Sequence, residues 1–215
     1  MNVLLVRHGE TAWNREGRYQ GRTDVPLSVD GEAQARALAA RLANIPIAFA
    51  IASPLSRARN TAEAVLVGRG LELELDDRLV EIGHGAWEGK LASDAETADA
   101  AMFKTWRTAP SADFAAGPGG ESLGEVRARA WPVLVAACDR LRGDETALIA
   151  AHDAVNRVLL CQLLGLPLER VWTFRQAPAT LNALSGSGLS DLQVVRLNDS
   201  EHVAPLLQEA RHRAL

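Results

Sequence analysis

The sequence predicts an α/β fold, a three-layer α/β/α sandwich around a mostly parallel sheet, with a helical lid excursion. Three short apolar runs carry this prediction, at residues 3–6, 49–52 and 147–151. Their length and unbroken apolar character suit strands that are buried on both faces. Helix-like segments lie between these runs, and this alternation favours parallel strands with helices on both faces. We expect residues 1–215 to form a single domain, since 215 residues suffice for one such core.

Composition narrows the class of protein. The chain is 47% hydrophobic and 23% charged, which is ordinary for a globular domain, and its net charge is −4. This charge argues against a general nucleic-acid binder and against a patch for anionic membranes. We find neither a leader nor an apolar run of membrane length, so we expect a soluble, cytoplasmic protein. Cys138 and Cys161 lie in apolar, helix-like contexts and are predicted to be buried free thiols.

The first half of the chain contains four further predicted elements. Residues 12–21 are polar and rich in glycine, which predicts an ordered loop. Ser28 is a candidate N-cap for a helix that Pro46 ends. A second helix is expected over residues 61–67, and the period-two pattern of residues 71–75 predicts a half-exposed strand.

Residues 81–121 interrupt the alternation, and we expect them to form a lid over the site. They contain glycines around Trp87, a helix-like stretch at 95–106 and a Gly-Pro loop at 117–120. Ser122 and Glu125 then have the spacing of a capping box, which opens a helix that extends to about residue 141. A kink is expected at Pro132 inside that helix.

The end of the chain completes the predicted sheet. A helix is expected at about residues 155–164, followed by two strands near 180–184 and 191–197. The tail is expected to form a short, weakly apolar helix.

Basic and imidazole side chains follow the buried strands. Arg7 and His8 come directly after the first run, Arg57 lies in the turn after the second, and His152 follows the third. Because the carboxyl ends of parallel strands meet at one edge of a sheet, we expect these four side chains to converge.

Such a cluster suits phosphoryl transfer. Two guanidiniums can bind non-bridging phosphate oxygens, and a histidine held among cations can attack phosphorus. The reaction also needs a proton donor for the leaving alkoxide, for which Glu81 is the best placed carboxylate. A metal site is the competing interpretation, but the other histidines lie in dissimilar contexts and no His-Glu-x-x-His or Cys pair occurs, so we expect no metal.

The motifs around these residues give the chain its resemblance to a known family. It resembles the histidine phosphatase superfamily, the phosphoglycerate mutase-like group, and specifically its phosphatase branch. The matching positions are residues 5–11, Asn14, Gln20, Gly21, Asp24, residues 26–28, Gly31, residues 53–58, Thr61, Ala62, Glu81, residues 87–89, residues 118–122 and His152.

The resemblance implies roles for individual residues. His8 would be the phosphorylated nucleophile and Glu81 the general acid. Arg7, Arg57 and His152 would form the phosphate pocket. Asn14 would add a polar contact to the phosphate, and Gln20 and Gly21 would also bind substrate. The resemblance implies neither a metal nor another cofactor.

Asp153 departs from the family pattern, which usually has Gly after the second histidine. A carboxylate there would repel phosphate, so we expect Asp153 to turn away and cap the following helix. The alternative is that Asp153 contacts a polar or cationic part of the substrate. His84 is expected to be a surface residue of the lid. Arg22 is expected to be a solvated loop arginine, with a second anion as its alternative ligand.

The resulting functional hypothesis is a metal-independent phosphomonoesterase acting on small phosphorylated metabolites. The alternative is a 2,3-bisphosphoglycerate-dependent phosphoglycerate mutase, which would share every catalytic residue. Residues 102–116 contain only Lys104 and Arg107 as bases and no tyrosine. The resemblance is therefore to the phosphatases. A non-catalytic phospholigand-binding module is the third hypothesis, disfavoured because the nucleophile and both arginines are present.

The sequence permits more than one role for two groups of aromatic and apolar residues. Phe103, Trp106 and Phe114 are predicted to be lid core, with an apolar leaving-group pocket as the alternative. A surface formed by Val171, Trp172 and Phe174 is a candidate interface for a homodimer.

Overall fold

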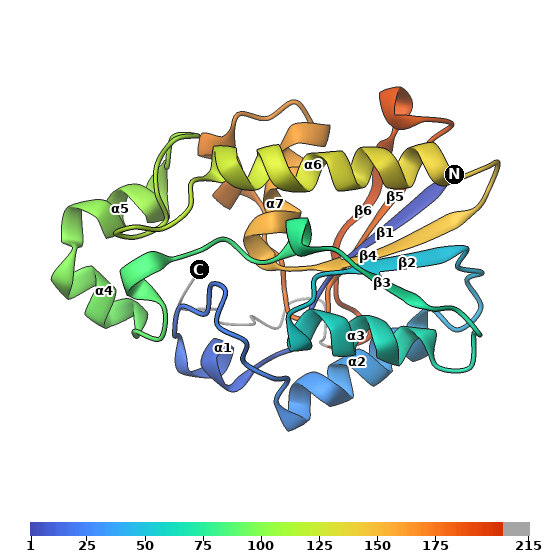
Figure 1. Cartoon of the computed structure of the whole chain (residues 1–215), viewed down its shortest axis with the longest axis horizontal. Coiled ribbons are helices and arrows are strands. Elements are labelled where there is room, and N and C mark those ends of the chain that lie inside the picture. The colour runs from blue at the N-terminus through green and yellow to red at the C-terminus, as the bar shows by residue number, and fades with distance from the viewer. Residues whose placement is uncertain (204–215) are drawn as a thin grey trace.

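One six-stranded mixed sheet runs through the computed structural model, which describes residues 1–203 of the chain (Figure 1). The strands lie in the order β3-β2-β4-β1-β5-β6. Pairing is parallel from β3 to β1, while β5 runs antiparallel to both β1 and β6. The strands are β1 (Asn2–Arg7), β2 (Phe49–Ala52), β3 (Leu73–Leu75), β4 (Thr146–Ala151), β5 (Leu181–Ser185) and β6 (Gln193–Asp199). The predicted mostly parallel sheet is confirmed.

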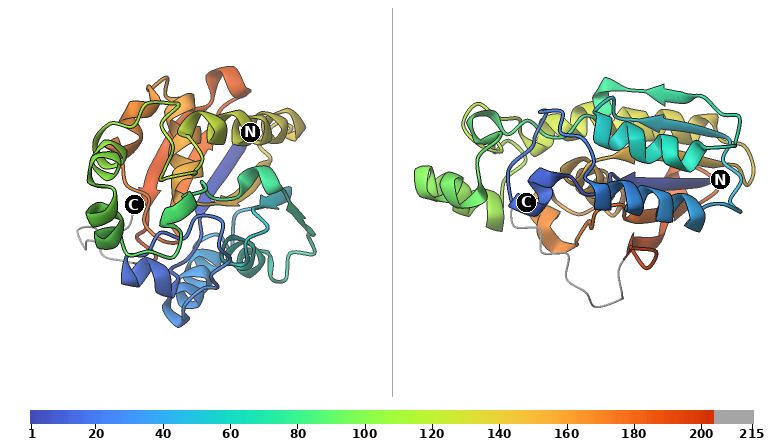
Figure 2. Two further views of the ribbon diagram at one scale, coloured as in Figure 1. Left: turned by 60° about the vertical axis from the view of Figure 1, so that its left-hand side comes forward. Right: turned by 90° about the horizontal axis from the view of Figure 1, so that it is seen from below.

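Helices cover both faces of the sheet, as the three-layer prediction requires (Figures 1 and 2). The helices α2 (Val29–Arg41) and α3 (Ser56–Leu66) pack against one face. The long helix α6 (Leu123–Arg140) and α7 (Asp153–Leu163) pack against the other. Alternate residues of β1 serve the two cores, since Val3 and Leu5 belong to the α6–α7 side and Leu4 and Val6 to the α2–α3 side.

The lid lies at the end of the molecule where β1, β2 and β4 finish (Figure 1). It contains α4 (Ala92–Ala98) and α5 (Ala100–Thr108). Trp87 and Trp106 are fully buried in it, and the Trp87 indole N–H donates to Asp99 over 2.7 Å. Phe103 and Phe114 are partly buried against the same core. The lid-core interpretation of the aromatic residues is therefore confirmed.

Several predicted boundaries were wrong. Residues 12–21 are not all loop, because α1 (Ala12–Glu16) lies within them. Thr11 and Asn14 close a reciprocal capping box there, which the sequence pattern conceals because Asn replaces the usual Glu or Gln. The helix α2 ends well before Pro46, and α3 begins at Ser56 rather than Thr61. Other predicted features are confirmed, among them the capping box of Ser122 and Glu125.

Two glycines allow the loop after β1 to pack against the start of α2. A Cβ atom on Gly31 would lie 1.9 Å from the Glu10 carbonyl oxygen, and one on Gly9 would lie 2.5 Å from the Gly31 carbonyl oxygen. No side chain fits such a contact with backbone. The main chain that follows His8 is therefore fixed by direct contact with a helix.

The remaining features concern the surface and the chain end. Cys138 and Cys161 are buried free thiols, as predicted. Among residues 1–203, no helix combines the length and the apolar character that crossing a bilayer requires. The helix expected in the tail lies outside the described residues.

Val171 is buried within the chain itself, and the Trp172 indole donates to the Trp106 carbonyl oxygen over 2.5 Å. This segment therefore anchors the lid, and the homodimer stays a prediction.

Candidate active site

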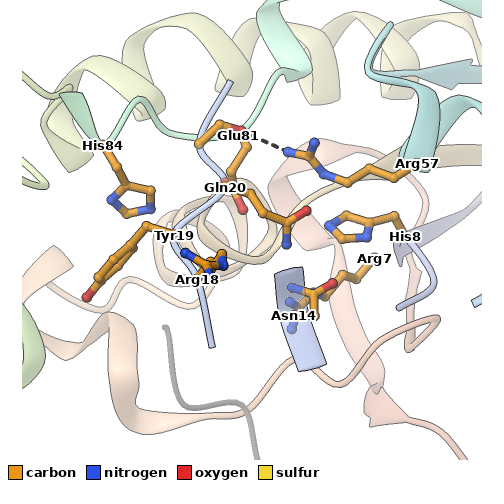
Figure 3. Close-up of a pocket in the computed structure, with 10 residues that line it drawn as sticks. Arg7, His8, Asn14, Arg18, Tyr19, Gln20, Arg57, Glu81 and His84 are labelled. Atoms are coloured by element: carbon orange, nitrogen blue, oxygen red, sulfur yellow. Dashed lines mark hydrogen bonds between the residues drawn. The ribbon is translucent and has the colours of Figure 1, made fainter. Parts of the chain in front are cut away.

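The strand ends deliver the predicted side chains to one pocket (Figure 3). Arg7 is the last residue of β1, Arg57 lies in the first turn of α3 directly after β2, and His152 follows β4. The residues that line the pocket are Arg7, His8, Asn14, Arg18, Tyr19, Gln20, Gly21, Arg57, Glu81 and His84. The His152 ring lies beside that of His8, with 5.1 Å between the ring centroids. The predicted convergence is thus confirmed, since all four basic and imidazole side chains gather at one edge of the sheet.

A backbone carbonyl fixes the protonation of His8. Its Nδ1 lies 2.6 Å from the Gly9 carbonyl oxygen, and the ring is 2% exposed. Because a carbonyl oxygen can only accept a hydrogen bond, Nδ1 must carry the proton. In the neutral ring, Nε2 then holds the lone pair, which is the arrangement that a nucleophilic histidine needs.

His152 is a second buried imidazole, and it is neutral. Its Nε2 lies 2.8 Å from the Ser53 hydroxyl oxygen. Burial, together with the charge of Arg57 and the neighbouring His8, holds the pKa of His152 well below its usual value of 6.5. Its Nδ1 is buried and has no hydrogen-bond partner among residues 1–203. A polar group that enters the site would satisfy this nitrogen.

The two arginines are held in place by main-chain oxygens. Arg57 donates to the carbonyl oxygens of Thr23 and Gly21, each over 2.8 Å, and the second bond is drawn in Figure 3. Arg7 donates to the Gln176 carbonyl oxygen. Burial lowers the pKa of Arg57 to about 10, so the guanidinium remains charged at neutral pH. In the described part of the chain, the Nε atoms of both arginines are buried without a partner. Two fixed cations with unused donors suit an oxyanion.

Two amides present donors to the same space. The Asn14 side-chain oxygen accepts from the Thr11 backbone N–H over 3.0 Å. The Gln20 side-chain oxygen accepts from the Thr11 hydroxyl over 2.9 Å. Since the amide oxygens are occupied, the NH₂ groups of Asn14 and Gln20 are the ends that can donate to a ligand.

Glu81 lies in the wall of the pocket, and its surroundings raise the pKa of its carboxyl group. It is 4% exposed, and its carboxylate accepts from the backbone N–H of Ile82 over 2.9 Å. Burial and then the nearby Asp153 raise its pKa above the usual 4.5. A carboxyl group that keeps its proton toward neutral pH can act as a general acid.

The prediction for His84 was wrong, because this residue is buried and lines the pocket. Its ring lies 4.6 Å from that of Tyr19 and 5.8 Å from that of Trp106, between centroids. Its Nδ1 is 3.0 Å from the Ala116 carbonyl oxygen, and burial lowers its pKa to about 4. Within the described residues its Nε2 is buried and unpartnered. The loop that carries His84 packs closely against residues 118–120, since a Cβ atom on Gly85 would lie 2.2 Å from the Pro118 carbonyl oxygen.

The expectation that Asp153 caps a helix was also wrong. The N-cap of α7 is His152, and Asp153 is the first residue of the helix. Its carboxylate instead contacts Arg7 at 3.3 Å and Arg157 at 2.9 Å.

Arg22 is more than half exposed and pairs with Glu121 at 3.2 Å, which agrees with the prediction of a solvated loop arginine.

Sequence reasoning missed several residues that support the site. Ser53, which contacts His152, lies in a stretch quoted for the family resemblance, so its motif was a usable signal. Thr11 organises Asn14 and Gln20 and likewise belongs to the first motif. Gln176 acts through its backbone carbonyl, which no side-chain pattern reveals.

The chain belongs to the histidine phosphatase superfamily (branch 1), whose sequence profile matches residues 3–200. It is 32% identical, over the whole length of both chains, to phosphoserine phosphatase 1 of Hydrogenobacter thermophilus. It is also 35% identical to the probable phosphoglycerate mutase GpmB of Salmonella choleraesuis, over 78% of this chain and 76% of that one.

A solved structure supports the same assignment. The mycobacterial glucosyl-3-phosphoglycerate phosphatase, in complex with VO3, superimposes with a TM-score of 0.83 at 29% identity and covers 92% of this chain and 98% of that one. The two relatives that are named as phosphatases favour a phosphatase over a mutase. The chain is accordingly a phosphomonoester hydrolase of the histidine phosphatase type.

Proposed function

We propose that the protein hydrolyses small phosphomonoesters without a metal, through a phosphohistidine on Nε2 of His8. The observation that carries the proposal is the contact of His8 Nδ1 with the Gly9 carbonyl oxygen. This contact leaves the lone pair on Nε2 and fixes the ring in a pocket that also holds Arg7, Arg57 and Glu81.

The first chemical step transfers the phosphoryl group to the enzyme. Arg7, Arg57, His152 and the amides of Asn14 and Gln20 bind the non-bridging oxygens. The Nε2 lone pair attacks phosphorus, and the bond between phosphorus and the ester oxygen breaks. Glu81 gives its proton to that oxygen, so the alcohol leaves neutral.

The second step returns the enzyme to its starting state. The ionised Glu81 takes a proton from a water molecule, whose oxygen attacks the phosphohistidine. The bond between phosphorus and nitrogen breaks and its electron pair returns to Nε2. Inorganic phosphate leaves, and Glu81 is again protonated.

The proposed substrate is a small phosphorylated metabolite. The relatives named above suggest phosphoserine as the first compound to assay and sugar-linked phosphoglycerates as the second. We place the reaction in the cytoplasm, which the two buried free thiols support because they suit a reducing compartment.

The test is the release of inorganic phosphate from an aryl phosphate in the presence of EDTA. The parent protein should turn over, and His8→Ala should lose that activity while keeping its fold by circular dichroism. Retained turnover in His8→Ala, or turnover that EDTA abolishes, would contradict the proposal.

The mutase stays the second candidate because GpmB is among the relatives. With 2,3-bisphosphoglycerate as primer, a mutase would convert 3-phosphoglycerate to its isomer, whereas the proposed enzyme should release phosphate instead. A protein that bound phosphate but never labelled His8 would be a binding module.

A further inference from the structure

A buried carboxylate occupies the position after the second histidine. Asp153 has no exposed surface. One of its oxygens accepts from NH1 of Arg7 over 3.3 Å, and the other accepts from Nε of Arg157 over 2.9 Å. Ionised groups are costly to bury unless they are paired, so we treat Arg7, Asp153 and Arg157 as one buried triad.

The triad leaves part of Arg7 directed at the pocket. NH1 of Arg7 is occupied by Asp153 and by the Gln176 carbonyl oxygen. The Nε atom is buried without a partner in the described chain, and the side chain lines the pocket beside His8. The carboxylate therefore fixes one edge of the guanidinium while other donors remain for a phosphoryl group.

Arg157 offsets the charge that Asp153 adds. A carboxylate beside a phosphate site weakens phosphate binding by repulsion. Arg157 lies one helical turn beyond Asp153 and is only 8% exposed. Because of this second cation, the triad keeps one net positive charge, the charge that Arg7 would carry alone.

Arg157 also connects the triad to the lid. Its guanidinium donates to the carbonyl oxygens of Val171, over 3.2 Å, and Phe174, and lies 5.0 Å from the centre of the Trp172 ring. The Trp172 indole in turn donates to the Trp106 carbonyl oxygen in α5. A continuous set of contacts therefore joins the phosphate-binding arginine to the lid.

We propose that Asp153 and Arg157 are positioning residues, which hold the Arg7 guanidinium for the phosphoryl group and offset one another's charge. This inference rests on the proposed function, because it assumes that Arg7 binds the phosphoryl group. It predicts that removing Asp153 and Arg157 together, which leaves the net charge of the site unchanged, weakens phosphate binding because Arg7 loses its fixed edge.

The test is a cycle of Arg157→Gln, Asp153→Gly and the double variant. It measures the inhibition constant of inorganic phosphate against an aryl phosphate substrate, together with kcat and the melting temperature. Arg157→Gln leaves an unbalanced carboxylate and should weaken phosphate binding by about tenfold or more. Asp153→Gly alone has two opposing effects, because Arg7 loses its fixed edge while the site gains one net positive charge. The double variant keeps the net charge of the parent triad, so its weaker phosphate binding measures the lost positioning of Arg7.

Arg69→Gln is the matched control. The Arg69 side chain also donates hydrogen bonds to backbone, to the carbonyl oxygens of Ile45, Leu42 and Val65, but it does not line the pocket. This variant should lower the melting temperature and leave the inhibition constant within about twofold of the parent. Should Arg157→Gln fail to fold, Arg157→Lys keeps the charge and should retain phosphate binding far better than the double variant.

Each outcome separates the inference from the proposed function. An inhibition constant that Arg157→Gln does not change, or a double variant that binds phosphate as tightly as the parent, would overturn the positioning role. A parent protein that neither turns over nor binds phosphate would instead overturn the proposed function.

Discussion

The two ends of the pocket are built differently. The phosphate end, defined by Arg7, His8, Arg57 and His152, comes from the ends of β1, β2 and β4 and from the turn into α3. The lid end, defined by Arg18, Tyr19 and His84, comes from the loop after α1 and from the excursion over residues 81–121.

This difference indicates that the phosphate end carries out phosphoryl transfer and that the lid end selects the organic part of the substrate. At the phosphate end, buried side chains are held by backbone carbonyls at a rigid sheet edge, as phosphoryl transfer requires. At the lid end, the side chains come from connecting segments, which vary more readily than strands do. A shared phosphate end and a variable lid end would let relatives with similar folds act on different phosphate esters.

The largest expected effect concerns Glu81, which links the two ends. Glu81→Gln should lower kcat for an alkyl phosphate by about 10²–10⁴-fold, because the alkoxide loses its proton donor. An aryl phosphate with an acidic phenol needs less protonation and should lose much less. Equal losses for both substrates would show that Glu81 does not protonate the leaving group.

The pH profile should reveal the same carboxyl group. Its pKa is raised in the folded protein, so the proton needed for the first step is present below that pKa and is lost as pH rises through it. The parent's kcat for an alkyl phosphate should therefore fall on the alkaline side. Glu81→Gln should lack this limb, and a limb that persists in the variant would belong to another group.

A substitution behind the phosphate end tests its rigidity. Gly31→Ala places a Cβ atom against the Glu10 carbonyl oxygen and should cost about 1–3 kcal/mol of stability. The melting temperature should fall by about 2–4 °C per kcal/mol, and phosphate affinity should fall with it. Gly188→Ala, where a Cβ meets no atom within 4 Å, is the control and should change neither quantity. An unaltered melting temperature in Gly31→Ala would show that the loop can shift.

A substitution at the lid end should separate the two ends most clearly. His84→Phe keeps a ring against Tyr19 and Trp106 but removes the buried Nε2. We expect KM for some organic phosphates to change by up to about tenfold, the effect of one hydrogen bond. The inhibition constant of inorganic phosphate should stay within about twofold. A parallel loss of phosphate affinity would mean that His84 belongs to the phosphate end.

The smallest effect is expected where the lid returns to the sheet. Ser122→Ala removes the side-chain oxygen that accepts from the Glu125 backbone N–H and should cost about 1 kcal/mol. The melting temperature should fall by about 2–4 °C while kcat is retained. A large loss of kcat would show that this cap controls closure of the lid.

The phosphate end could be predicted from sequence because its signals are local. A buried strand directly followed by Arg7 and His8, and another directly followed by His152, require only that the strands be parallel. The same reasoning found the sheet, its two covered faces and the capping box of α6. Glu81 follows no buried strand, and its assignment rested on its position before the glycine-rich excursion and on the resemblance.

The lid end could not be predicted because its contacts are long-range. His84 was expected at the surface of the lid, yet Tyr19 and Trp106, which are distant in the sequence, pack against its ring. Asp153 was expected to cap a helix, and only the fold reveals Arg7 and Arg157 on either side of its carboxylate. Gln176 contributes a carbonyl oxygen, which every residue type possesses.

Trapping the phosphoenzyme tests the central claim most directly. The protein would be mixed with an excess of a rapidly cleaved aryl phosphate in EDTA, denatured within milliseconds under alkaline conditions and digested for mass spectrometry. We predict one phosphoryl group on the peptide that contains His8, stable to alkali, lost in acid and absent from His8→Ala. Turnover at full rate without any label on His8, or a label on another residue, would contradict the proposed mechanism.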